Sequence, residues 1–215
     1  MLRFPSSRSA SGQDGAHCCR PDGHVGAVEL RPIYVQNHLM LVPTPAIVQP
    51  RLPMTRHIRI REEGSGLDAR VLLLDDLAPR WSELLARLAA AGGAYDAIHA
   101  MWTGPEISCP ILAGSLPQAV GELLPLPLEN ATSYPDEGEI ALVHAPANTW
   151  KGQPPQPFLD IGLFYGRGAR LLMPMGWIQA AVCARVVSED LGLVRAACQK
   201  IRQRGACRLS FHLAP

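Results

Sequence analysis

Between Gly138 and Val187 the chain carries three strand-sized apolar runs, and turn-rich segments separate them. The runs cover residues 139–145, 158–165 and 177–187. Short apolar runs bounded by glycine and proline are typical of β-strands that are buried in a sheet. We therefore expect this stretch to form the heart of a β-barrel and one wall of a pocket.

The chain on either side adds further strands but only two helices. Residues 57–61 alternate polar and apolar and, with the apolar run 69–74, predict a hairpin. Asp75 and Asp76 are expected to cap a first helix, whose apolar stripe follows helical spacing: Trp81, Leu84, Leu85 and Leu88. A second helix is predicted from Ser188 to about Arg204, and a closing strand follows at 208–213.

This order of elements restricts the fold class. Strands and helices do not alternate as a doubly wound α/β sheet requires. Many strands with one early helix, and one helix just before the last strand, favour a mainly β fold: a closed antiparallel β-barrel capped by two α-helices. The final strand is then free to pair with the first.

The first 53 residues are predicted to lie outside this fold. Residues 1–26 are rich in Arg, Ser, Gly and Pro and have no hydrophobic period, and five prolines interrupt residues 27–53. We expect residues 1–53 to be a disordered tail or a misassigned N-terminal extension. Residues 54–215 are expected to form the barrel domain.

Charge and cysteine content exclude several partners. The formal net charge of +1 gives no reason to expect nucleic acid, and no apolar stretch is long enough to span a bilayer. The six cysteines have no zinc spacing, which favours reduced thiols in a cytoplasmic protein. The tandem apolar strands leave assembly into a homo-oligomer as an alternative.

Five segments from 99 onward resemble a family of bacterial domains of unknown function, DUF3830. They are HAMWTG at 99–104, EN at 129–130, GEI at 138–140, DIGLFYG at 160–166 and MPMGW at 173–177. The resemblance covers nearly everything from Met54 onward and nothing before it. It implies a cyclophilin-like barrel and no established activity.

The same resemblance argues against prolyl isomerase activity. A true cyclophilin carries an arginine in a Phe-His-Arg segment beside a Gln-Phe-Phe segment. Here the corresponding stretch is 97–102, which contains no arginine, and Pro157-Phe158-Leu159 only partly matches the second motif. Without a cation near the prolyl nitrogen the reaction loses its main electrostatic assistance.

Three polar clusters lie at predicted strand ends or in loops, where binding and catalytic residues concentrate. They are His99 with Trp102 and Glu106, Glu129 with Asn130 and Tyr134, and His144 with Asn148 and Trp150. On a closed barrel they could converge with Tyr165, Met173 and Trp177 on one aromatic-walled pocket. Glu129, Glu106 and His99 are the candidates for acid–base catalysis, and the others for ligand binding.

These residues also have purely structural interpretations. His99 could be a hydrogen-bonded core histidine, Trp177 a core residue, and Glu129 with Asn130 a tie between a proline-rich loop and backbone amides. No His-x-His pair or HExxH helix supports a metal site. There is no GxSxG, P-loop or Rossmann fingerprint either, so we expect neither metal nor cofactor.

Three functions follow from these patterns. The first is a domain that binds a small polar metabolite and acts on it by acid–base chemistry. The second is a non-catalytic module that binds a peptide or protein segment in the same cleft. The third is a structural or oligomeric subunit without a ligand. An enclosed pocket would favour the first, a long open groove the second, and a filled barrel the third.

Overall fold

The structure is a computed structural model that describes residues 55–214. The predicted N-terminal extension, residues 1–53, lies outside the described residues. No helix among residues 55–214 is both long and apolar enough to cross a membrane.

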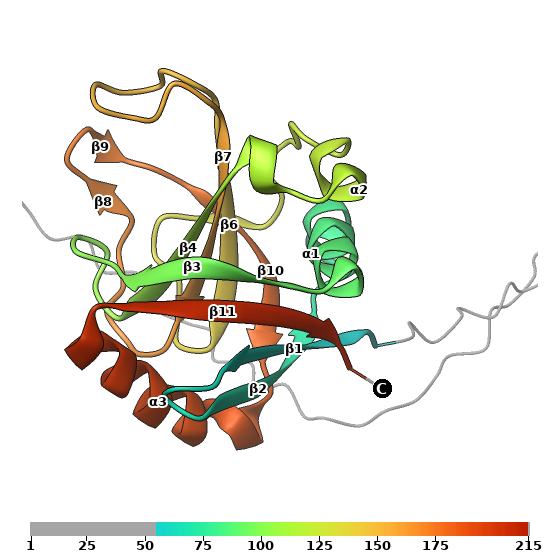
Figure 1. Ribbon diagram of the computed structural model, residues 1–215, viewed down its shortest axis with the longest axis vertical. Helices are drawn as coiled ribbons and strands as arrows, with labels where there is room; N and C mark the ends of the chain where they lie inside the picture. The colour runs from blue at the N-terminus through green and yellow to red at the C-terminus, as the bar shows by residue number, and fades with distance from the viewer. Residues whose placement is uncertain (1–54, 215) are drawn as a thin grey trace, which may run out of the picture. The chain divides into compact units, whose positions relative to one another are not determined.

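The described residues contain eleven strands, which form the framework of the fold (Figure 1). They are β1 (His57–Glu62), β2 (Leu67–Leu73), β3 (Gly93–His99), β4 (Glu106–Leu112), β5 (Ala131–Thr132), β6 (Glu139–Ala145), β7 (Phe158–Phe164), β8 (Leu172–Met173), β9 (Gly176–Trp177), β10 (Ala180–Val186) and β11 (Ala206–Leu213). The helices are α1 (Pro79–Ala91), α2 (Gln118–Gly121) and α3 (Leu191–Arg204).

Eight strands close into an antiparallel barrel. The main sheet has the order β2-β1-β11-β3-β4-β7-β6-β10-β5, and an additional pairing of β10 with β2 closes it. β5 adds to one edge of β10, and β8 pairs with β9 in a separate hairpin. The predicted β1–β2 hairpin and the predicted pairing of the last strand with the first are both confirmed. The mainly β barrel expected from the sequence is therefore the fold.

The two longer helices pack on the barrel, on different sides in Figure 1. The predicted stripe of α1 is buried, with Trp81 only 1% exposed, and α3 buries Val194, Cys198 and Ile201. The prediction of two helices missed α2, a single turn in a proline-rich segment that shows no helical period.

The helix starts also differ from the prediction. Ala78 precedes α1 without a side-chain cap, because Asp75 instead accepts hydrogen bonds from Arg56. Before α3, residues 188–190 form a 3-10 turn, so that helix begins at Leu191 and not after Ser188.

Alternation along the strands divides the apolar residues into two layers. Side chains such as Ile107, Leu142 and Ile161 fill the barrel interior, and they form one buried cluster with the apolar faces of the helices. A second, smaller cluster lies on the outer face of β6, β7 and β10: Ala141, Phe164, Ala169, Leu171, Ala180 and Val182. The barrel interior is thus occupied by side chains, and the outer face is left to form a site.

The predicted strand 177–187 is shorter than expected. Trp177 belongs to the β8–β9 hairpin, and β10 begins only at Ala180. The break allows the β8–β9 segment to leave the sheet, where Leu171 and Ile178 rejoin the outer layer.

Candidate functional site

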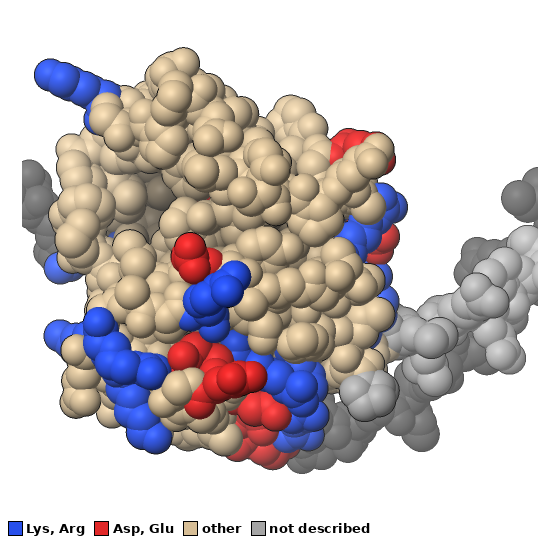
Figure 2. Space-filling model, in the orientation of Figure 1, with Lys and Arg blue, Asp and Glu red and all other residues tan. Residues whose placement is uncertain are grey.

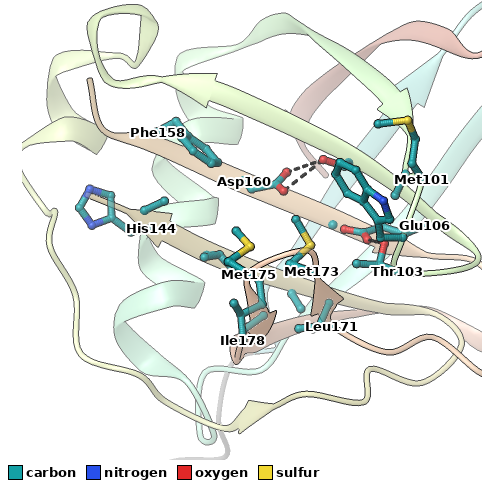
Figure 3. A pocket seen from close by; sticks show the side chains of 18 of the residues that line it. Met101, Thr103, Glu106, His144, Phe158, Asp160, Leu171, Met173, Met175 and Ile178 are labelled. Carbon is teal, nitrogen blue, oxygen red and sulfur yellow. Dashed lines mark hydrogen bonds between the residues drawn. The ribbon is translucent and has the colours of Figure 1, made fainter. Parts of the chain in front are cut away.

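A cavity of about 250 Å³ lies on the outer face of the barrel. Its floor is formed by outward-facing residues of β4, β6 and β7 (Figure 3). The loop that follows β3, the loop 146–157 and the β8–β9 segment form its walls. The volume lies slightly below the range of about 300–1,000 Å³ that is typical of ligand pockets, which restricts the site to a small ligand.

Asp160 is a polar residue in the middle of an otherwise apolar strand. Because side chains alternate along β7, Leu159 and Ile161 face the barrel interior while Asp160 faces the cavity. The hydroxyl of Ser108, on the neighbouring strand β4, donates to both of its carboxylate oxygens at 2.9 and 3.1 Å (Figure 3). Burial raises the pKa of Asp160, and the Ser108 hydrogen bond opposes that increase.

Glu106 places a second carboxyl at the same site. Its side chain is 5% exposed, and its Oε2 accepts a hydrogen bond from Thr103 Oγ1. Burial raises the pKa of Glu106 to about 8, the charge of Asp160 adds to the increase, and the Thr103 hydrogen bond opposes it. A carboxyl of this kind carries a proton at neutral pH and is able to act as a general acid.

The two carboxyls have no cationic partner at the site. Among the described residues that line the cavity, none is lysine or arginine. His144, on β6, is the remaining titratable lining residue, and burial lowers its pKa, which favours the neutral imidazole. In Figure 2 the surface is hollowed in a region without charged residues, whereas charged side chains gather lower down, over α3 and the β1–β2 hairpin.

The remaining walls are aromatic and sulfur-bearing. Trp150 meets Phe158 edge-on, with ring centroids 5.7 Å apart and an interplanar angle of 90°. Trp102 lies at the rim and is 52% exposed. Three methionines complete the lining: Met101, Met173 and Met175 (Figure 3). Flexible thioethers adapt to the shape of an apolar ligand, and aromatic faces also attract cations.

The structure brings together five of the residues predicted for the pocket. They are Trp102, Glu106, His144, Trp150 and Met173. The first four come from two of the three predicted clusters, which confirms neither the roles assigned to them nor a common ligand.

The third cluster lies elsewhere. Oε2 of Glu129 accepts hydrogen bonds from the backbone amides of Arg80 (2.9 Å) and Trp81 (3.4 Å), at the first turn of α1. Asn130, with a left-handed φ of 44°, donates from Nδ2 to the carbonyl of Val182 at 2.8 Å. Glu129 therefore ties the proline-rich segment to α1, Asn130 ties it to β10, and neither side chain lines the cavity.

The other predicted residues also fall outside the cavity lining. His99 Nε2 lies 2.7 Å from the hydroxyl of Tyr165, which is itself 5% exposed. Tyr134 and Trp177 contact each other on the surface with ring centroids 5.2 Å apart. Asn148 has φ 60°, the left-handed conformation that asparagine tolerates in a turn.

Sequence reasoning did not include Asp160, Ser108 and Thr103 among the site residues. One signal for Asp160 was present, since a carboxylate inside FLDIGLF must be buried or face a site. Thr103 and Ser108 carry no such signal because hydroxyl residues are common in loops and strands. Among the described residues, no group of three or more His, Cys, Asp and Glu side chains is placed to hold a metal.

Fold and site together define a closed eight-stranded barrel whose candidate site is an acidic, apolar-walled cavity on its outer face. Residues 60–213 match the family "Protein of unknown function (DUF3830)", and the chain belongs to that family. No curated protein matches the sequence.

Several solved structures are similar in fold at low sequence identity. McbB in complex with tryptophan is 14% identical with a TM-score of 0.45, over 72% of this chain and 44% of McbB, so the chain spans less than half of that protein. The Mimivirus cyclophilin is 12% identical with a TM-score of 0.45, over 76% of this chain and 89% of its own. A hypothetical protein from Archaeoglobus fulgidus is 17% identical with a TM-score of 0.40, over 74% and 95%.

Proposed function

We propose that this protein binds a small metabolite in the cavity on the outer face of its barrel. One observation carries the proposal: two carboxyls, Glu106 and Asp160, face a cavity whose walls are mostly aromatic, aliphatic and thioether side chains. Burying a carboxyl costs free energy unless something compensates for it. A fold that keeps two of them at a cavity supports a role in binding or chemistry more readily than a role in packing.

Acid–base chemistry on the bound metabolite is the finer part of this proposal. Glu106 is the candidate proton donor because its pKa is raised to about 8 and it lines the cavity. Asp160, held by Ser108, is the candidate for orienting the ligand. Glu129 and His99 have no part in it because they lie at α1 and beside Tyr165.

Binding of a peptide segment is the second candidate function. Met101 is 74% exposed and Trp102 is 52% exposed at the rim of the cavity, where an extended chain could contact them. Prolyl isomerase activity is not part of it, since no arginine is among the described lining residues. We keep a cytoplasmic location in the proposal because the four described cysteines are all free.

A thermal-shift screen of the full chain tests the proposal. The panel contains small amines, amides, carboxylates and proline peptides. A ligand at a hundred times its dissociation constant stabilises the folded state by about 2.7 kcal/mol. The variant that blocks the cavity is Ala100→Trp, which replaces the small side chain of a half-buried lining residue with a bulky indole. Ala196→Trp, on an exposed position of α3, is the matched control.

We expect at least one small molecule to stabilise the wild type and Ala196→Trp but not Ala100→Trp. Stabilisation by peptides alone would move the assignment to the second candidate function. A panel without any stabilising compound, or one whose effects survive in Ala100→Trp, would contradict small-molecule binding at this cavity.

A further inference from the structure

The oxygen atoms of the two carboxyls are unevenly satisfied. Asp160 accepts a hydrogen bond from the Ser108 hydroxyl, and Oε2 of Glu106 accepts one from the Thr103 hydroxyl. Oε1 of Glu106 accepts no hydrogen bond from any described side chain, although the residue is only 5% exposed and lines the cavity. When Glu106 is ionised, this oxygen is an acceptor available to a group that enters the cavity.

The backbone register places the two carboxyls on either side of a glycine. Ser108 pairs with Gly162 across β4 and β7, while Glu106 and Asp160 lie on either side of this pair. A Cβ on Gly162 would lie 2.5 Å from Oε1 of Glu106 and 2.8 Å from Cε2 of Phe164. The absence of a side chain at Gly162 therefore leaves room for the Glu106 carboxyl itself, which lines the cavity.

The chemistry of the lining excludes several ligand classes. An anion would meet two carboxyls without a lysine or arginine among the described lining residues. A sugar or another many-hydroxyl ligand needs more hydrogen-bonding groups than this largely apolar wall offers. A bare divalent cation is not favoured, because no group of three or more His, Cys, Asp and Glu side chains among the described residues is placed to hold one.

An organic cation satisfies each of these conditions. We propose that the ligand is a small amine whose ammonium group lies between Glu106 and Asp160 and whose apolar body lies against the aromatic and methionine walls. The inference rests on the proposed function and specifies its ligand class. An ammonium group donates to the free oxygen and supplies the missing positive charge, while tryptophan and phenylalanine rings stabilise a cation further.

Proton linkage gives this inference a signature of its own. The titratable groups that line the cavity are Glu106 on β4, Asp160 on β7 and His144 on β6, and in Figure 3 the His144 ring lies away from the two carboxyls. The hydroxyls beside the carboxyls are those of Thr103 and Ser108. A bound cation favours the ionised carboxyls, so the amine should release protons on binding. Its affinity should rise with pH as the carboxyls of the free protein ionise.

Calorimetry of the full chain with three matched compounds tests this. Phenethylamine supplies the cation, phenethyl alcohol is its neutral analogue, and phenylacetate supplies an anion. We expect phenethylamine to bind at least about tenfold more tightly than the alcohol, since charge-assisted hydrogen bonds are about twice as strong as neutral ones. Between about pH 6.5 and about pH 8.5 the affinity for phenethylamine should increase roughly tenfold, with proton release, and the affinity for the alcohol should not.

Two variants and a control test whether the Glu106 and Asp160 carboxyls bind the ammonium group. The variants are compared at about pH 8.5, where Glu106 of the free protein is largely ionised because its pKa is about 8. There Asp160→Asn and Glu106→Gln each remove one charge with little change in shape, and each should weaken phenethylamine binding roughly tenfold while leaving the alcohol within about twofold. Asp96→Asn, at an exposed position on β3 outside the cavity, should change neither. If circular dichroism shows that one variant does not fold, the other variant still tests the proposal.

The outcomes separate this inference from the proposed function. Equal or tighter binding of the alcohol or of phenylacetate would overturn the amine, and so would full amine affinity in both variants or no amine binding at all. If the alcohol binds and Ala100→Trp abolishes that binding, the cavity still has its proposed function and only the ligand class is wrong.

Discussion

Gly162 and Glu106 share one small volume: a Cβ added to Gly162 would lie 2.5 Å from Oε1 of Glu106. The glycine has no positive φ, so its backbone conformation is open to any residue. What requires glycine here is space at the cavity floor, because Phe164 crowds the same point. The Glu106 carboxyl can therefore occupy its position only because residue 162, on the neighbouring strand β7, has no side chain.

Gly162→Ala should destabilise the protein and displace the Glu106 carboxyl. Overpacking of a filled site costs about 1–3 kcal/mol, which urea unfolding measures. Gly192→Ala is the control, since a Cβ there meets nothing within 4 Å and its φ is not left-handed. That variant should be neutral or gain up to about 1 kcal/mol of helix stability. Equal stability of the two variants would mean that the Glu106 side chain moves away without cost.

The stability of the folded state should decrease with pH because of Glu106. Its pKa is raised from the ordinary value of 4.5 to about 8, so the folded state holds a proton that the unfolded state has already lost between those values. The stabilisation is fully present below about pH 4.5 and is lost as pH rises through about 8. Within this window the free energy of unfolding should fall by roughly 1 kcal/mol per pH unit.

The pH dependence of the unfolding free energy should be compared between wild type and Glu106→Gln from about pH 6.5 to about pH 8, where other groups contribute least. Burial lowers the pKa of His99 and of His144, so their effect has the opposite sign and falls below that range. Glu106→Gln should remove most of the slope in urea unfolding, and the part that remains belongs to Asp160, whose pKa is also raised. An unchanged slope in Glu106→Gln would show that this carboxyl is already ionised at neutral pH.

The barrel was predictable because its pattern is local. Alternation in β1, the apolar runs of β6 and β7 and the helical stripe of α1 each follow from a few consecutive residues. The closing pair of β1 with β11 followed from the order of elements. The short helix α2 could not be found because one turn is too short for a hydrophobic period.

The site was only partly predictable because it depends on register. Glu106 and Trp102 could be predicted as site residues because one is polar, the other is aromatic and both lie near strand ends. Both line the cavity. The approach of Ser108 to Asp160 depends on how β4 pairs with β7, and a slip of either strand by one residue would place the two side chains on opposite faces of the sheet. Single-sequence reasoning does not determine that register.

Tyr165→Phe should destabilise the fold without affecting the cavity. Its hydroxyl lies 2.7 Å from Nε2 of His99 at a buried position, and a typical hydrogen bond contributes about 1 kcal/mol. Tyr134→Phe is the control because Tyr134 is 65% exposed, and it should change the free energy of unfolding by no more than about 0.5 kcal/mol. A loss of ligand binding in Tyr165→Phe with stability intact would restore His99 and Tyr165 to the site.

Glu129 supports a related prediction about the first turn of α1. That helix has no capping side chain of its own at Ala78, and Glu129, distant in sequence, accepts from the amides of Arg80 and Trp81 instead. Its carboxylate also lies 3.7 Å from the Arg80 guanidinium, although an exposed ion pair of this kind adds little. The main contribution is that of a helix cap supplied by another segment.

Glu129→Ala should therefore lower the free energy of unfolding by about 1 kcal/mol, as the loss of an N-terminal cap does. Glu129→Gln keeps an acceptor oxygen and should lose less, which separates the cap from the charge. Both variants should bind cavity ligands as the wild type does, because Glu129 does not line the cavity. Weaker ligand binding in Glu129→Gln at unchanged stability would instead make Glu129 a functional residue, and the site would then extend beyond the cavity to the start of α1.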